Sequence, residues 1–472
     1  MTISRRSTFA RTNAALLSSA AALFAVTMAG APEPAFAQST CELNPGWGDG
    51  GADAYGDRAF ACGRYADAHG YGATALGNRA DAYGRFSFAA GYQAYALGRG
   101  ATATGAFSDA VGWYSTANGF GADAYGPGAT AFGAQSEANG WDATAVGHEA
   151  YADGRGATAT GAHSTADGWY ATANGYSSVA DGPGATATGA HSEAYGWDAT
   201  ANGHSAYADG RGATATGAHS TADGWYATAN GYASEADGRG ATATGAYSEA
   251  DGRYATANGY ASEAYGTGAT ATGAYSEAYG RHSTAYGYGS EAHGRHSTAV
   301  GAHTHADGQG SVAIGTDSYG NGAEATRDNQ FVLGTSNHTY TAPGITSAAS
   351  RAAQSGPLEV VTSDANGNLA TDGGLLFEEI SKVGGGVAIA LALENPDLVA
   401  GERFALAGNV GFWEGNVALG FSGAGVLGHN FAGHGERWTL SAGVGFTLRE
   451  DSFGGRKSEN SVGGRAGLQV SW

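Results

Sequence analysis

The sequence contains few cysteines and few basic residues for its length. Cys41 and Cys62 are the only cysteines among 472 residues, too few for a disulfide-rich scaffold or a cysteine-based zinc site. In an exported chain they could form one disulfide, but their spacing does not establish it. Acidic residues outnumber basic ones by 43 to 23, and the formal net charge is −20. So acidic a surface argues against nucleic acid and anionic lipid headgroups as partners.

The chain also lacks the patterns of two familiar fibrous folds. Glycine supplies 82 residues, yet no Gly-X-Y triplet recurs, which excludes a collagen-like triple helix. Every seventh residue from Gly56 to Gly315 is glycine, and a sevenfold period usually indicates a coiled coil. However, glycine in a helix interior costs about 1 kcal/mol relative to alanine, and no Leu or Ile occupies an a/d seam. The coiled coil is therefore excluded as well.

The N-terminal segment, residues 1–37, has the features of a secretory signal. A basic region precedes an apolar stretch at residues 14–29, and Ala35-Phe36-Ala37 predicts cleavage between Ala37 and Gln38. The apolar stretch is too short and too polar for a transmembrane helix. We therefore expect an exported chain that begins at Gln38.

Small and polar residues alternate within each seven-residue unit, as in Ala157-Thr158-Ala159-Thr160-Gly161. Alternation with period two predicts a short strand, and the glycine with the next two residues predicts a turn. The repeats, residues 50–315, therefore predict a β-solenoid. The third and fifth residues of each unit should lie between the strands, where only small side chains fit.

Two kinds of unit alternate, so the true coil has 14 residues. The kind that includes Ala162–Gly168 carries an acid at its fourth or sixth position in almost every copy, whereas the kind that includes Arg155–Gly161 carries none. We expect the acidic strand to face water and the other strand to pack against another copy of the chain. The residues assigned to this interface strand are Phe60, Leu76, Phe132, Val146, Thr158, Thr160, Val312 and Ile314.

A column of tryptophans recurs every 28 residues, with Arg155 and Arg211 between some of its members. Its members are Trp113, Trp141, Trp169, Trp197 and Trp225. Stacked aromatic and guanidinium groups along one corner would contribute about 0.5–1 kcal/mol per exposed contact. They could simply stiffen the turns. Alternatively the column, with Tyr170 and Tyr226, binds a host ligand, since many equivalent weak sites give avidity.

Two other solenoid functions fit the repeats less well. The Thr-x-Thr rows are similar to the flat arrays of ice-binding solenoids, but the same positions become Phe, Leu, Val and Ile at both ends, which favours a packed interface. Calcium-binding repeats have nine residues with Asp in the turn, whereas here the acids lie on the strands. No catalytic set stands apart from the repeat, because His163, His191 and His219 follow its period. We expect no enzyme, metal or cofactor.

The C-terminal third changes character twice. Residues 326–374 predict a turn-rich connector, and residues 375–398 a short helical segment that Gly384-Gly385-Gly386 interrupt. Residues 399–472 hold four alternating runs typical of transmembrane β-strands. Four strands cannot close a barrel and lipid tolerates no open edge, so several chains must share one barrel, unless this is a small soluble sheet. The membrane-facing residues would be Phe404, Leu406, Phe412, Leu419, Phe421, Trp438, Leu440, Phe446, Leu468, Val470 and Trp472.

At this point the chain resembles the YadA-like trimeric autotransporter adhesins. Gly310–Gly315, with the sequence GSVAIG, is similar to the family's head repeat, and residues 375–472 are similar to its anchor of a short helix, four strands and a terminal aromatic. The resemblance implies a homotrimer with a left-handed parallel β-roll head, here residues 38–325. It also implies a 12-stranded barrel in the Gram-negative outer membrane, inserted by the barrel-assembly machinery. Thr replaces the family's Val or Ile in most coils, and the usual neck segment is missing.

The expected function is therefore adhesion at the cell surface. The barrel would anchor and export the head, and the head would attach to host matrix proteins or glycans. The alternative is a structural or self-aggregation protein of biofilms with no host receptor. An ice-binding solenoid is a third interpretation.

Overall fold

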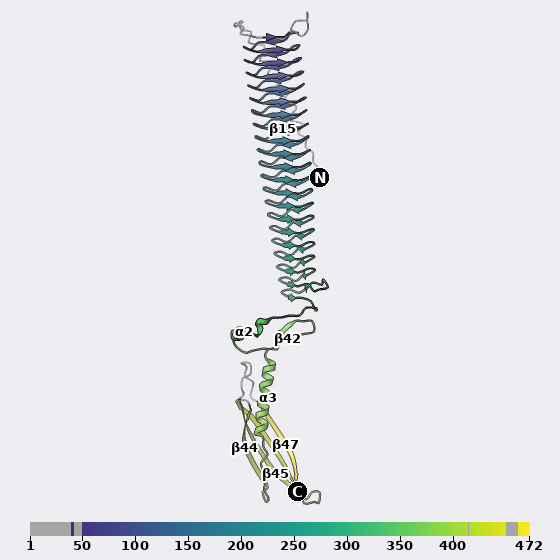
Figure 1. Cartoon of the computed structure of the whole chain (residues 1–472). Coiled ribbons are helices and arrows are strands. Elements are labelled where there is room, and N and C mark those ends of the chain that lie inside the picture. Colours follow the sequence, from purple (N-terminus) through teal and green to yellow (C-terminus); the bar gives the residue numbers. More distant parts are fainter. Residues whose placement is uncertain (1–38, 42–49, 414, 450–460) are drawn as a thin grey trace. The chain divides into compact units, whose positions relative to one another are not determined.

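The computed structural model describes residues 39–41, 50–413, 415–449 and 461–472 (Figure 1). The chain divides into two compact units, Met1–His338 and Thr339–Trp472. The predicted signal peptide and its cleavage site between Ala37 and Gln38 lie outside the described residues.

The first unit is a parallel β-solenoid of 14-residue coils, as the period predicts (Figure 1). Three-residue strands recur every 14 residues from β3 (Phe60–Cys62) to β39 (Val312–Ile314), and two-residue strands from β2 (Asp53–Ala54) to β38 (His305–Ala306). Each strand pairs in parallel with the equivalent strand of the next coil, so that Thr158 lies beside Thr172. Equivalent positions of successive coils therefore form columns.

The solenoid interior is built from alanine and serine. Ala157, Ala159, Ser164 and Ala166, the third and fifth residues of two successive units, are fully buried, which confirms the predicted placement. The Ser164 hydroxyl donates to the Gly161 carbonyl at 2.9 Å, so the small polar side chain is satisfied inside its own turn. Two strands can approach this closely because no larger side chain lies between them.

The glycine column has a steric cause. A Cβ on Gly168 would lie 2.1 Å from the Gly182 carbonyl oxygen of the next coil, and Gly168 is not in a left-handed conformation. Gly161, which ends the other kind of unit, has both a φ of +127° and a carbonyl oxygen 2.4 Å from its would-be Cβ. Close stacking of the coils thus requires glycine at both corners, and only one corner also requires its conformational freedom.

Both ends of the solenoid carry extra structure. At the N-terminal end β1 (Ser39–Thr40) pairs with β3, and a disulfide joins Cys41 to Cys62 with Cα atoms 5.0 Å apart. This resolves the pairing that the spacing left open.

At the other end, β40 (Glu324–Ala325) and β41 (Phe331–Leu333) add a last coil, and β41 pairs with β39. The sequence placed residues 331–333 in the connector. The connector prediction is wrong there, because an insertion after Gly315 breaks the seven-residue count without ending the strand stacking.

The second unit begins with short elements. They are the 3-10 helix η1 (Pro343–Thr346), α2 (Ala348–Ala353) and the antiparallel hairpin of β42 (Val361–Ser363) and β43 (Leu369–Thr371).

Helix α3 (Leu375–Ala392) runs without a break through Gly384-Gly385-Gly386, so the predicted interruption is wrong. These glycines let the helix approach the sheet: Gly385 is buried, and a Cβ on Gly384 would lie 2.7 Å from Asn416 Nδ2. Tertiary packing outweighs the low helix propensity of glycine. Among the described residues, no helix has the length and apolar character needed to cross a membrane.

Four long antiparallel strands complete the chain in sequential order. They are β44 (Phe404–Trp413), β45 (Asn416–His429), β46 (Arg437–Arg449) and β47 (Val462–Ser471), as the four alternating runs predict. Helix α3 packs on one face of this sheet through Ala388, Ile389 and Ala392.

Candidate functional site

The tryptophan column lies on the corner that follows the acidic strand. All five indoles are exposed, by 57–68 %, and successive members are two coils apart. The Arg155 guanidinium lies 5.9 Å from the ring centroid of Trp141, and Arg211 lies 5.8 Å from that of Trp197. Arg239 makes the same contact with Trp225 at 5.8 Å, a pair that the sequence reasoning did not name.

Tyr170 and Tyr226 directly follow two of these tryptophans. Both are exposed and have a positive φ, 57° and 58°, which folds each ring back over the preceding coil. The Tyr170 ring lies against Gly156, and the Tyr226 ring against Gly212. The corner therefore presents paired indole and phenol rings with cationic groups between them, on an otherwise acidic molecule.

The opposite corner carries an unbroken ladder of aromatic rings, which the sequence reasoning missed. One ring per coil packs edge to face on the next, with centroids 5.3–5.8 Å apart. The ring alternates between the first and second residues of the turn, so no single column reveals it. The ladder consists of His148, His163, Tyr176, His191, His204, His219, Tyr232, Tyr247, Tyr260, Tyr275, Tyr288 and His303. Edge-to-face pairs contribute about 0.5–1.5 kcal/mol each, so the ladder stiffens this edge.

The predicted interface strand presents its fourth and sixth residues outward. Phe60, Leu76, Val146, Thr158, Thr160, Val312 and Ile314 are half-buried within the chain, and Phe132 is exposed. Thr158 aligns with Thr144 and Thr172 in neighbouring coils, which makes a column of hydroxyl and methyl groups. Whether another copy covers this column stays a prediction.

The acidic strand stacks carboxylates in register. Asp109, Asp123 and Glu137 lie side by side on successive coils and are half-buried, so this face is less open to water than expected. Burial, with the neighbouring charges of Asp109 and Glu137, raises the pKa of Asp123 to about 7. Burial, with the charge of Asp67, likewise raises the pKa of Asp81 to about 7. The column thus concentrates negative charge that the fold tolerates only at a cost.

Within the part of the chain that the structure describes, two clusters of side chains could hold a metal ion, although the sequence indicated none. Glu277, Glu291 and His293 form one, on the acidic strand, and His148, Glu149 and His163 form the other, on the corner with the aromatic ladder.

The YadA head domain repeat matches eleven segments between residues 68 and 318, and together they cover more than half of the chain. The segments are 68–94, 89–115, 110–136, 138–164, 166–192, 194–220, 222–248, 250–276, 264–290, 278–304 and 292–318. The chain belongs to the YadA head-repeat family. No curated protein matches it. Each match spans about two coils, the same period as the tryptophan column.

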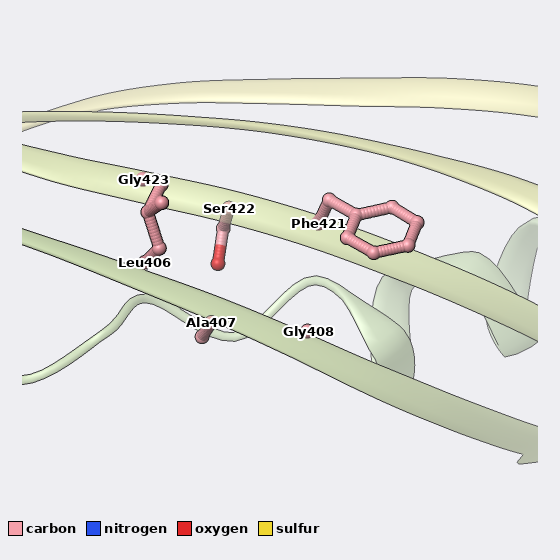
Figure 2. Close-up of a pocket in the computed structure, with 6 residues that line it drawn as sticks. All are labelled: Leu406, Ala407, Gly408, Phe421, Ser422 and Gly423. Atoms are coloured by element: carbon pink, nitrogen blue, oxygen red, sulfur yellow. The ribbon is translucent and has the colours of Figure 1, made fainter.

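The C-terminal sheet of this YadA-family chain is consistent with the family's anchor. Its outward face is apolar: Phe404, Leu406, Phe412, Phe421, Leu440, Leu468 and Trp472 are exposed, whereas Leu419, Trp438, Phe446 and Val470 are half-buried. Figure 2 shows a hollow between β44 and β45 lined by Leu406, Ala407, Gly408, Phe421, Ser422 and Gly423. None of the six is titratable, so the hollow offers no acid–base chemistry.

The inward face of the sheet is small and polar, and helix α3 occupies it. A Cβ on Gly411 would lie 2.0 Å from the Ala388 carbonyl oxygen, and one on Gly420 would lie 2.2 Å from that of Ala392. Arg465 donates from Nη1 to the Leu393 carbonyl at 2.5 Å. Within the described residues, β44 pairs only with β45 and β47 only with β46, so both edges of the sheet are open.

Proposed function

We propose that the protein is a trimeric autotransporter adhesin whose head attaches the cell to host matrix proteins or glycans. The tryptophan column carries the proposal. Five large aromatic side chains are more than half exposed at a regular interval, although water disfavours such exposure. Aromatic and arginine side chains dominate binding hot spots, and their repetition on a rigid solenoid supplies avidity.

The anchor would consist of three copies of the C-terminal sheet. The open edges of β44 and β47 support this, because three four-stranded sheets joined edge to edge make a closed 12-stranded barrel, and only a closed barrel satisfies its backbone in lipid. The apolar outward face would contact lipid of the Gram-negative outer membrane, and α3 would fill the lumen. Insertion would depend on the barrel-assembly machinery.

The head would form a trimer through the strand that includes Thr158, Thr160, Val312 and Ile314. Support comes from its outward face, which is half-buried in the chain alone and becomes apolar at the C-terminal end. The acidic strand would then face outward, where like charges on three chains lie furthest apart.

Adhesion of cells that express the full chain tests the function. Wild-type cells should bind at least one of collagen, fibronectin, laminin or an arrayed glycan. Replacement of all five tryptophans by Ala should reduce binding at least tenfold at equal surface expression. The control replaces Tyr176, Tyr232, Tyr260 and Tyr288 on the opposite corner by Ala, which should leave ligand binding in place.

The same cells distinguish the alternative function. Clumping without binding to any ligand would favour a self-aggregation protein of biofilms. The trimer is tested separately: unheated detergent extracts should migrate as a trimer, and a monomeric band would contradict the shared barrel.

A further inference from the structure

Near the C-terminal end of the solenoid, histidines lie among the carboxylates on three successive coils of the acidic strand. Strands β34 (Glu277–Ala278), β36 (Glu291–Ala292) and β38 (His305–Ala306) pair in parallel register. Glu277, Glu291 and His305 therefore share one column, while His293 and Asp307 follow two residues after Glu291 and His305. All five side chains come from rigid strands or the residues that end them, which suits a preorganised site.

The spacing of three ligand atoms fits a metal ion better than hydrogen bonds. His293 Nε2 lies 3.6 Å from Glu277 Oε2 and 3.8 Å from Glu291 Oε2, beyond normal hydrogen-bond length. Ligands bound tetrahedrally at 2.0–2.2 Å stand about 3.4 Å apart. A small inward movement of the side chains would place all three atoms around one ion.

A second layer of contacts orients these ligands. Asp307 Oδ1 lies 3.2 Å from His293 Nδ1, so a proton on Nδ1 leaves the lone pair of Nε2 directed toward the two glutamates. This carboxylate–histidine arrangement is the usual support of a metal-bound imidazole. The other oxygen of Glu291, Oε1, lies 3.1 Å from His305 Nε2, which holds the second ligand in place.

The other histidine cluster lacks these features. His163 Nδ1 lies 3.1 Å from Glu149 Oε2, so the two groups already form a hydrogen bond. All three of its residues are exposed, and they lie in turns. In the proposed cluster Glu277 and Glu291 are half-buried and only His293 is exposed, and the local excess of carboxylates favours a cation.

We propose that Glu277, Glu291 and His293 bind a divalent transition-metal ion of the zinc class. One imidazole and two carboxylates are suitable ligands for such an ion, and three protein ligands leave a fourth position open to water or an external group. Asp307 and His305 act as positioning residues. The site is independent of the tryptophan column and of adhesion.

Metal titration of the untagged full-length protein in detergent tests the site. After treatment with chelator and dialysis, Zn²⁺ should bind with at least one ion per chain by calorimetry. Co²⁺ should give the strong visible absorption of a four-coordinate ion. H293A should lose this absorption, and D307N should raise the Zn²⁺ dissociation constant about 10–100-fold. E249Q, on the same strand column away from the histidines, is the matched control and should bind as wild type.

Two results would overturn the assignment. One is wild-type affinity and absorption in H293A. The other is loss of the Co²⁺ absorption in H163A and not in H293A, which would place the ion in the other cluster. Unchanged trimer mobility and circular dichroism of H293A and D307N would show that lost binding does not reflect misfolding.

Discussion

The ring of Tyr170 occupies the space that a side chain on Gly156 would need. A Cβ on Gly156 would lie 2.7 Å from Tyr170 Cδ1, and the same relationship joins Tyr226 to Gly212 at 2.8 Å. A ring that folds over the preceding coil, as Tyr170 does, therefore leaves no room for a side chain at the equivalent position one coil earlier. This steric rule fits the alternation of glycine with Tyr170 and Tyr226 at this corner, whereas His282 and His296 on successive coils stack face to face instead.

The first prediction follows from this contact. G156A should destabilise its coil by about 1–3 kcal/mol, the usual cost of overpacking. This cost adds to the backbone cost of placing alanine at a φ of +68°. Hydrogen exchange of the full-length protein should show faster exchange in the coils around residue 156.

G121A is the matched control for G156A. Gly121 has a similar φ of +59°, but its would-be Cβ meets only Gln135 Cγ, at 3.9 Å. This variant isolates the backbone cost. Y170A should rescue G156A to the level of G121A, and failure of the rescue would contradict the steric rule.

The second prediction concerns pH. The pKa of Asp123 is raised to about 7 by burial and by Asp109 and Glu137, so between about pH 4 and 7 the folded state binds more protons than the unfolded state. The free energy of unfolding then decreases as pH rises through this range. The melting temperature of the solenoid should therefore fall between about pH 5 and pH 8, and D123N should flatten the fall.

Asp317 should give a pH dependence of stability with the opposite sign. Hydrogen bonds from Asn321 and Asn337 lower the pKa of its carboxyl below the value in the unfolded chain. Its contribution to the free energy of unfolding is therefore present above the unfolded pKa and is lost as pH falls. D317N should reduce stability at neutral pH and leave the decrease between about pH 5 and 8 unchanged. A melting temperature that rises toward pH 8 in the wild type would contradict the prediction.

The third prediction concerns the N-terminal end of the solenoid. Reduction of the Cys41–Cys62 disulfide should release β1 from β3, because a disulfide typically contributes about 2–4 kcal/mol to the stability of the segments it joins. Limited proteolysis should then cut first near residues 50–62, and C41S/C62S should show the same pattern without reductant. Reductant should leave the cleavage pattern of that variant unchanged.

The fourth prediction concerns the anchor. G420A should prevent α3 from seating on the sheet, because its Cβ would lie 2.2 Å from the Ala392 carbonyl oxygen. The trimer band should therefore be lost from gels of unheated detergent extracts. G408A is the control, because its Cβ would meet the Phe421 ring at an ordinary 3.6 Å. Wild-type trimer levels in G420A would show that the helix does not need this close approach.

The sequence predicted the architecture well because the architecture is periodic. Alternation within Ala157–Gly161 indicated which side chains lie inside, and the parity of the units separated the acidic strand from the threonine strand. The four long strands were also predicted, because each alternates over about ten residues. Three features were not predicted correctly: the continuity of α3 through its glycines, the strand β41, and the extent to which Asp109 and Asp123 are covered. Each depends on neighbours that the local pattern does not contain.

By itself, the sequence determined the solenoid, because residues 14 positions apart become neighbours in space when the repeats stack in register. It also determined where the chain turns and which columns are acidic, aromatic or small. Only the tertiary structure decided how side chains in adjacent columns meet. The aromatic ladder alternates between two turn positions, and His293 faces Asp307 with one nitrogen and two glutamates with the other. Such contacts depend on side-chain torsions and on distances of a few ångströms between coils, which a one-dimensional period does not specify.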